Sequence, residues 1–150
     1  MQRIPKGMRF LSPISSIRER GVGCVEPNVE QITHLMSQLR VALVPDEYTL
    51  QRDIQTVLDQ NGISYQKECL LAPRNRVDFL VEGGIVIEVK CGRQKPNLTR
   101  VLAQLHRYAA SEQVCALLLL VERNLVGVPK QIEGKPCKVL GLHRLWGVAL

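Results

Sequence analysis

The chain has 150 residues, 45% of them hydrophobic, which is enough for one domain with a real core and too little for a second catalytic domain. Lys and Arg outnumber Asp and Glu by 20 to 14, and the resulting charge of +6 favours a polyanionic partner. The longest apolar run, 114–121, is too short to cross a membrane. Five scattered cysteines without a Cys-x-x-Cys pair indicate reduced thiols, so we expect a cytoplasmic protein with no membrane partner.

The first part of the chain combines an irregular segment with a helix. Residues 1–26 contain prolines, serines and several basic residues without a sustained period, and we expect a basic N-terminal arm. Residues 27–150 then form a single domain. Apolar residues at helical spacing over 27–43 predict an amphipathic helix. Most such helices face their own core; the alternative partner for this stripe is a second copy of the chain, in a homodimer.

A second amphipathic helix begins at Pro45-Asp46-Glu47, with Asp46 as its N-cap. Glu47 shares the buried face of this helix. An acidic residue in a first turn is commonly explained by the helix dipole. The other interpretation is a carboxylate directed at a functional site. The residues expected to make the buried face are Leu50, Ile54, Val57 and Leu58.

Two short apolar runs, 76–82 and 85–90, predict neighbouring strands, and Gly83-Gly84 between them predicts a two-residue hairpin. Because side chains alternate along a strand, Glu88 and Lys90 should share one face. Asp78 on the first strand should then approach Glu88. The apolar residues expected on the opposite face are Val77, Phe79, Val81, Ile85, Ile87 and Val89.

Asp78, Glu88 and Lys90 together suit a metal-dependent phosphodiesterase. Two facing carboxylates provide oxygen ligands for Mg²⁺ or Mn²⁺, and a lysine beside them can orient a water and offset phosphate charge. The simpler interpretation is an ordinary Glu and Lys pair on a solvated strand face.

The second half of the chain alternates helix and strand. Residues 97–112 have helical periodicity, with Gln104 and Tyr108 one turn apart at the edge of the apolar stripe. Residues 114–121 predict a buried strand, and 137–142 a short last strand. Only six aromatic residues are present, so a stacking platform for single strands is not evident. The basic residues expected to contact nucleic acid are Arg93, Lys95, Arg100 and Arg107.

This order of motifs resembles the PD-(D/E)XK nuclease superfamily, and Gln104-x-x-x-Tyr108 resembles its RecB-type branch. The resemblance covers about 45–122. It implies an α/β, restriction-endonuclease-like core of helix, three-strand meander, helix and strand, here with an additional N-terminal helix. Two features depart from the pattern: no proline directly precedes Asp78, and no cysteine cluster suggests an iron–sulfur site.

The resemblance implies Mg²⁺-dependent or Mn²⁺-dependent hydrolysis of DNA. Asp78 and Glu88, with Glu47 as a third candidate, would bind the metal. Lys90 would assist the attacking water, and Gln104 and Tyr108 would support the site or the substrate. Two alternatives remain. The same triplet resembles a dimeric Holliday-junction resolvase, and a catalytically silent nucleic-acid-binding module could retain the fold for its basic surface.

Overall fold

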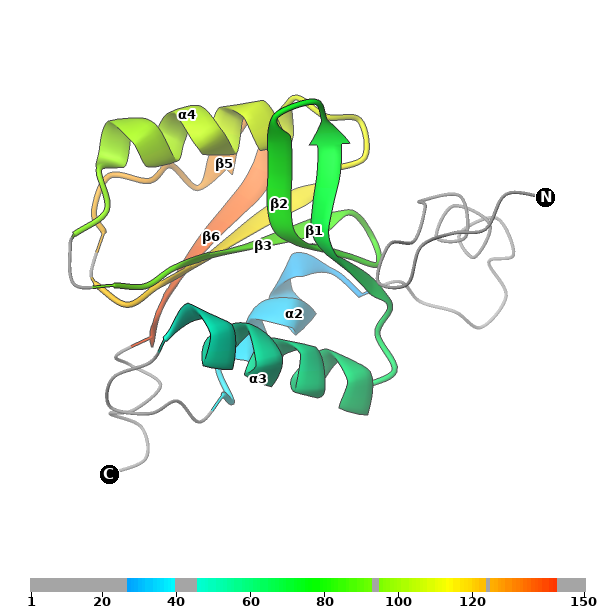
Figure 1. The fold of residues 1–150 in the computed structure, drawn as a ribbon. Coiled ribbons are helices and arrows are strands. Elements are labelled where there is room, and N and C mark those ends of the chain that lie inside the picture. Colours follow the sequence, from blue (N-terminus) through cyan, green and yellow to red (C-terminus); the bar gives the residue numbers. More distant parts are fainter. Residues whose placement is uncertain (1–26, 40–45, 93–94, 124, 143–150) are drawn as a thin grey trace.

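The computed structural model describes residues 27–39, 46–92, 95–123 and 125–142. Within these ranges the protein is an α/β fold whose mixed sheet lies between helices (Figure 1). Helices α2 (Val29–Met36) and α3 (Glu47–Gln60) cover one face, and α4 (Leu98–Ala109) covers the other. No helix of the described part is long and apolar enough to span a membrane. The predicted basic arm, 1–26, lies outside the described residues.

The sheet has six strands in the order β1-β2-β3-β4-β6-β5. The first three pair antiparallel, β3 pairs parallel with β4 and β4 with β6, and β5 pairs antiparallel with β6. The central strands β3 and β4 are buried almost throughout, as expected for parallel strands covered on both faces. The strands are β1 (Tyr65–Ala72), β2 (Asn75–Val81), β3 (Ile85–Lys90), β4 (Ala116–Val121), β5 (Gln131–Ile132) and β6 (Lys135–Gly141).

The predicted order of helix, three-strand meander, helix and strand is confirmed, as is the N-cap Asp46, whose side chain accepts a hydrogen bond from Thr49 N at 2.8 Å. The two predicted helix ends are wrong. The helix predicted over 27–43 ends at Met36, where Ser37 Oγ donates to the His34 carbonyl at 2.6 Å. The helix predicted over 97–112 ends at Ala109, because Lys135 Nζ donates to the carbonyls of Ala109 and Ser111, at 2.6 and 2.8 Å.

Two core clusters lie on opposite faces of the sheet. Ile85, Ile87 and Val89 pack toward α2 and α3, as predicted from their alternation. Val77 does not follow the prediction, because it packs in the cluster beneath α4 although Phe79 packs in the other. The change of face occurs at Asp78. The residue opposite Asp78 on β1 is Glu68, whose backbone has a φ of 50°.

The turn between β2 and β3 is one residue longer than the predicted two-residue hairpin. Val81 pairs with Ile85, so Glu82, Gly83 and Gly84 form the loop. Gly84 has a φ of 79°, and its carbonyl accepts from Cys115 N at 2.7 Å. A Cβ atom at this position would lie 2.8 Å from the Gln113 carbonyl oxygen. Gly84 therefore permits the close approach of the hairpin to the segment that leads into β4.

Gly84→Ala is expected to lower the free energy of unfolding by about 2 kcal/mol more than Gly134→Ala. Both glycines have a positive φ, but a Cβ at Gly134 would meet no atom within 4 Å. The pair therefore separates the steric clash from the backbone strain that both substitutions share. Chemical denaturation of the two variants measures the difference, and equal losses would show that the close approach at Gly84 is easily relaxed.

Candidate functional site

The candidate site lies where β2 and β3 separate. Their pairing runs from Val81–Ile85 to Phe79–Ile87, and Asp78 and Glu88 would be the next pair in this register. At this point the carboxylates accept the hydrogen bonds of the opposing backbone. Asp78 N donates to Glu88 Oε1 at 3.3 Å, and Val89 N donates to Asp78 Oδ2 at 2.8 Å. Each acid is thus held in place by the strand that carries the other acid.

Lys90 completes the predicted triplet. Its Nζ lies 3.2 Å from Glu88 Oε2, and the two side chains are 27% and 6% exposed. Glu88 is the one charged residue that is buried in the described part of the chain. The interpretation as a solvated strand face therefore does not fit, because a solvated pair would not bury its carboxylate.

One carboxylate oxygen of the site remains available. Glu88 uses both oxygens, for Asp78 N and for Lys90 Nζ. Asp78 uses Oδ2, and no described residue donates a hydrogen bond to its Oδ1. This atom is not among the buried polar atoms that lack a partner, so it reaches solvent. Asp78 Oδ1 is consequently the atom of the pair best placed to meet a ligand.

Burial, followed by repulsion from neighbouring carboxylates, raises the pKa of both acids. For Asp78, burial is the largest cause, and Glu47 and Glu68 raise its pKa further, against the opposing effects of Val89 N–H and Lys90. For Glu88, burial and then the Asp78 carboxylate raise the pKa from 4.5 to about 7, again opposed by Lys90. Two carboxylates that share one cation retain excess negative charge.

The chemistry of this pair fits a hard divalent cation. Mg²⁺ is commonly held by one or two carboxylates, with water and substrate phosphate oxygens completing its coordination. Among the described residues, Lys90 is the one cation within ion-pair distance of either acid. A bound dication would offset the repulsion that raises both pKa values. Asp78 and Glu88 are therefore the residues that would hold Mg²⁺ or Mn²⁺.

Glu47 lies near this pair without joining it. Its exposed side chain in the first turn of α3 accepts a hydrogen bond from Gln51 Nε2 at 3.2 Å. In the described ranges, no three Asp, Glu, His or Cys side chains converge closely enough to hold a metal ion. A role for Glu47 as a third ligand stays a prediction, supported by its effect on the pKa of Asp78.

Glu68 is an acidic neighbour of Asp78 that was not predicted from the sequence. The register pairs Lys67 with Phe79 and Cys69 with Val77, so Glu68 lies opposite Asp78. Its exposed carboxylate is 3.7 Å from Arg76 Nη1. The only signal in the sequence was an acidic residue on a strand whose limits were not predicted.

Tyr108 anchors α4 to the strand that carries Asp78. Its buried hydroxyl donates to the Arg76 carbonyl at 2.8 Å, two residues before Asp78. Burial, then the charges of Glu88 and Asp78, raise the pKa of Tyr108. Gln104, one turn earlier, is half-buried, and no described residue is its hydrogen-bond partner. Tyr108 therefore links α4 to β2, and the Gln104 amide has no partner among the described residues.

Tyr108→Phe is expected to lower the free energy of unfolding by about 1 kcal/mol, because the Arg76 carbonyl loses its donor. Gln104→Ala should change it little, since no described residue is a hydrogen-bond partner of this amide. Thermal and chemical denaturation of the two variants provide the test. A larger loss for Gln104→Ala than for Tyr108→Phe would contradict the assignment of Tyr108 as the anchor.

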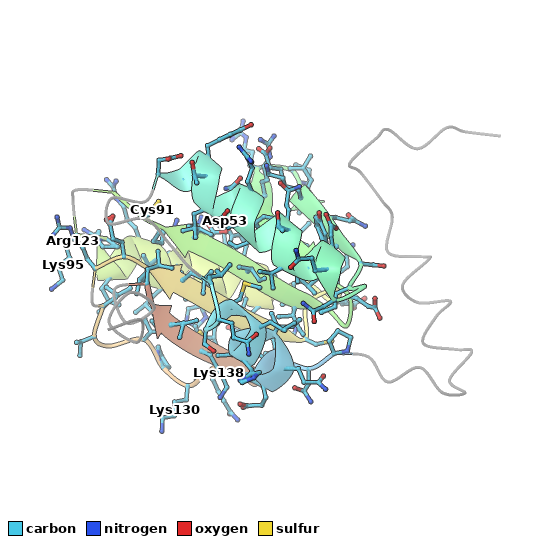
Figure 2. All side chains as sticks on the ribbon, turned by 90° about the horizontal axis from the view of Figure 1, so that it is seen from below. Asp53, Cys91, Lys95, Arg123, Lys130 and Lys138 are labelled. Carbon is cyan, nitrogen blue, oxygen red and sulfur yellow. The ribbon has the colours of Figure 1, made fainter. Side chains whose placement is uncertain are left out.

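Three of the four basic residues predicted to contact nucleic acid are described, and all three are exposed: Lys95, Arg100 and Arg107. Arg93 lies outside the described residues. Arg123, which was not predicted, follows β4, and its Nε donates to the Gly92 carbonyl at 3.4 Å. Figure 2 shows Lys95 and Arg123 at the edge of the molecule that also carries Cys91.

The site therefore combines two constrained acids, one lysine and nearby surface cations. Asp78, Glu88 and Lys90 come from two adjacent strands, and Tyr108 from the helix above them. Comparisons of the chain with models of protein families, with curated proteins and with solved structures found no match.

Proposed function

We propose that this protein is a metal-dependent deoxyribonuclease with a fold of the restriction-endonuclease type. Its active site for phosphodiester hydrolysis would consist of Asp78, Glu88 and Lys90. The observation that carries the proposal is the arrangement of these three side chains. Each acid accepts a backbone N–H of the opposite strand, and the lysine contacts the more deeply buried acid. Such an arrangement leaves a charged, partly desolvated site with one free carboxylate oxygen.

In the proposed mechanism, bound Mg²⁺ or Mn²⁺ supplies Lewis acidity toward the scissile phosphate and lowers the pKa of water. Asp78 and Glu88 would hold the cation, and the backbone N–H groups of Val89 and Asp78 keep the two carboxylates oriented. Lys90 would position the attacking water and offset the negative charge that develops in the transition state. Tyr108 would keep β2, and with it Asp78, at a fixed distance from α4.

The decisive experiment is cleavage of linear, circular, single-stranded and branched DNA with Mg²⁺ or Mn²⁺, analysed on gels. Cleavage that is abolished by EDTA and by Lys90→Met would support the proposal. Cleavage confined to four-way junctions by a dimer would favour the resolvase. DNA binding without any cleavage, across both metals and all substrates, would favour a silent binding module and contradict the nuclease.

Binding of DNA should depend on salt through the exposed cations near α4. Arg100→Gln with Arg107→Gln is expected to reduce the slope of log affinity against log salt by about one unit for each phosphate that is no longer neutralised, without altering sequence preference. Lys130→Gln, an exposed lysine on the loop before β5, is the matched control. An unchanged slope in the double variant would place the DNA elsewhere on the surface.

A further inference from the structure

A row of polar side chains on α3 leads away from the candidate site. Glu47, Gln51, Gln55 and Asp59 follow one another at intervals of four residues, which places each about one helical turn from the next. Gln51 is buried, and its amide contacts Glu47 at 3.2 Å. The residues of α3 that pack on the sheet are Leu50, Ile54 and Leu58, and each directly precedes a member of this row. The row therefore lies along the side of the helix next to its buried face.

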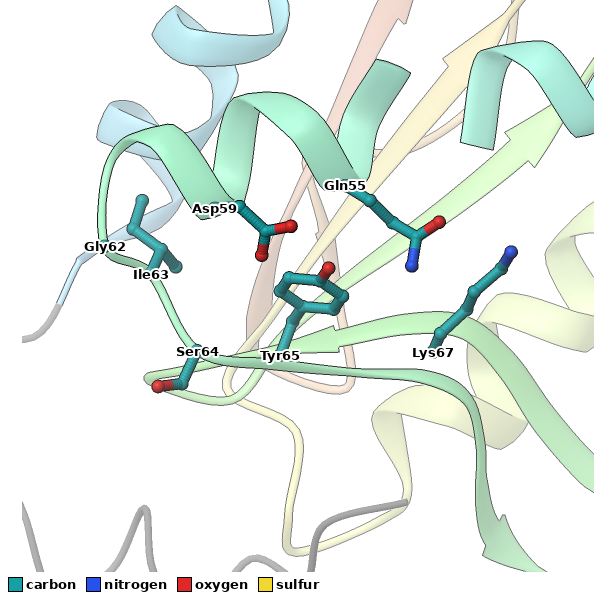
Figure 3. A pocket seen from close by; sticks show the side chains of 7 residues that line it. All are labelled: Gln55, Asp59, Gly62, Ile63, Ser64, Tyr65 and Lys67. Carbon is teal, nitrogen blue, oxygen red and sulfur yellow. The ribbon is translucent and has the colours of Figure 1, made fainter. Parts of the chain in front are cut away.

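The far end of this row lines a pocket between α3 and β1. The cavity is about 390 Å³ in volume, within the range of roughly 300–1,000 Å³ that small-molecule sites occupy. Gln55 and Asp59 line it from the helix, and Tyr65 and Lys67 line it from the strand (Figure 3). The Tyr65 hydroxyl points toward the helix between Asp59 and Gln55, with the Lys67 amine beyond Gln55. The Lys67 amine and the Asp59 carboxylate thus lie at opposite ends of the pocket.

The end with Lys67 is the one close to the candidate site. Lys67 pairs with Phe79, the residue directly after Asp78. Positions on adjacent strands that differ by one residue in register are about 6 Å apart at their Cα atoms. The side chains of Lys67 and Phe79 share the face of the sheet that α3 covers, so the pocket lies beside the candidate site rather than within it.

We infer that this pocket binds one unpaired nucleotide of the DNA strand that is cleaved, a conclusion that rests on the proposed function. Lys67 meets a phosphate of this nucleotide, and the base lies along Tyr65. The polar edge of the base meets the Gln55 amide and the Asp59 carboxylate. The charge of Asp59 repels phosphate, so the nucleotide enters in one orientation only.

The lining is suited to a nucleobase. The Tyr65 ring packs edge-on against Phe79, with centroids 5.9 Å apart, so its position is fixed before a ligand binds. Base contact with an aromatic side chain is worth about 1–3 kcal/mol and tolerates different bases. Within a duplex, however, a base is stacked and its pairing edge is occupied. The pocket therefore selects single strands, flaps or frayed ends.

The test measures binding in EDTA, so that it does not depend on cleavage. The full chain is titrated into a fluorescein-labelled single-stranded hexanucleotide and into a blunt duplex of the same sequence, and anisotropy is recorded. The wild type is expected to bind the single strand more tightly. Lys67→Gln and Gln55→Ala should each weaken single-strand binding roughly fivefold or more, while duplex binding stays the same.

Two further variants make the result specific. Lys67→Arg retains the positive charge and should restore binding, while Lys130→Gln removes a lysine far from the pocket and should leave binding unchanged. Melting temperatures of all variants are measured in parallel. If folded Lys67→Gln and Gln55→Ala proteins bind the single strand like the wild type, the pocket is not a nucleotide site.

Parallel cleavage assays with Mg²⁺ separate this inference from the proposed function. If the wild type cleaves DNA, and both pocket variants bind and cleave single strands normally, the pocket inference is wrong and the nuclease stands. If nothing is cleaved, but the pocket variants lose single-strand binding, the nuclease is wrong and the nucleotide site stands.

Discussion

Asp78→Asn is expected to abolish metal-dependent DNA cleavage, with a loss of about a thousandfold or more, while the protein remains folded. Asparagine keeps an oxygen that can accept the hydrogen bond from Val89 N, which Asp78 Oδ2 accepts at 2.8 Å. The substitution therefore preserves the local geometry and removes the negative charge of the solvent-accessible Oδ1. Single-turnover cleavage of labelled DNA with Mg²⁺ measures the loss.

DNA binding in the same variant should be unchanged or tighter, because a negative charge near the phosphate has been removed. Asp53→Asn is the matched control, since Asp53 lies on α3 outside both the triplet and the pocket, and its activity should equal that of the wild type. Undiminished cleavage by Asp78→Asn, or cleavage in EDTA, would contradict the proposed function.

The helices and strands that could be predicted are those defined by the spacing of apolar and capping residues close together in the sequence. β3 was predicted with its observed limits because its residues alternate around Glu88 and Lys90, and α3 was predicted because Asp46 caps a regular apolar stripe. The end of α4 depends instead on Lys135, 26 residues after Ala109. Such a contact leaves no local signal, so the periodicity alone extended the helix too far.

β1 shows why one strand had no predictable limits. Its buried residues Gln66 and Cys69 are three apart, whereas a regular strand places residues of one face two apart. Glu68 between them has a φ of 50°, which interrupts the alternation. The two-residue strand β5 is too short for any period to appear. The pocket depends on β1, so neither Tyr65 nor Lys67 was expected to form part of a site.

The candidate triplet was accessible from sequence because it depends on one hairpin. Glu88 follows Asp78 by ten positions, and the observed three-residue loop places the two opposite each other, whereas the predicted two-residue loop would have placed Asp78 opposite Val89. The hydrogen bonds from backbone N–H groups to the carboxylates were not predictable, since they require β2 and β3 to separate beyond the Phe79–Ile87 pair, at Asp78 and Glu88. These bonds orient the two carboxylates, and burial raises the pKa of each.

The raised pKa of Glu88 should make the free energy of unfolding depend on pH when it is measured in EDTA. Burial and Asp78 raise the pKa of Glu88 from 4.5 to about 7, so between these values the native state holds a proton that the unfolded state has released. The contribution of this group is complete below pH 4.5 and is lost as pH rises through about 7. At about 1.4 kcal/mol for each pKa unit, the loss by pH 8 is on the order of 3 kcal/mol.

Glu88→Gln is expected to remove most of this fall, because the amide cannot ionise. The variant should be more stable than the wild type at pH 8 and similar to it at pH 4, as measured by urea denaturation across the pH range. Glu112→Gln, an exposed residue after α4, should follow the wild-type curve. Adding Mg²⁺ at pH 8 should stabilise the wild type and not Glu88→Gln, since a cation that binds the native carboxylates relieves their repulsion. Parallel curves for the wild type and Glu88→Gln, with no response to Mg²⁺, would show that the buried pair is neither strained nor a cation site.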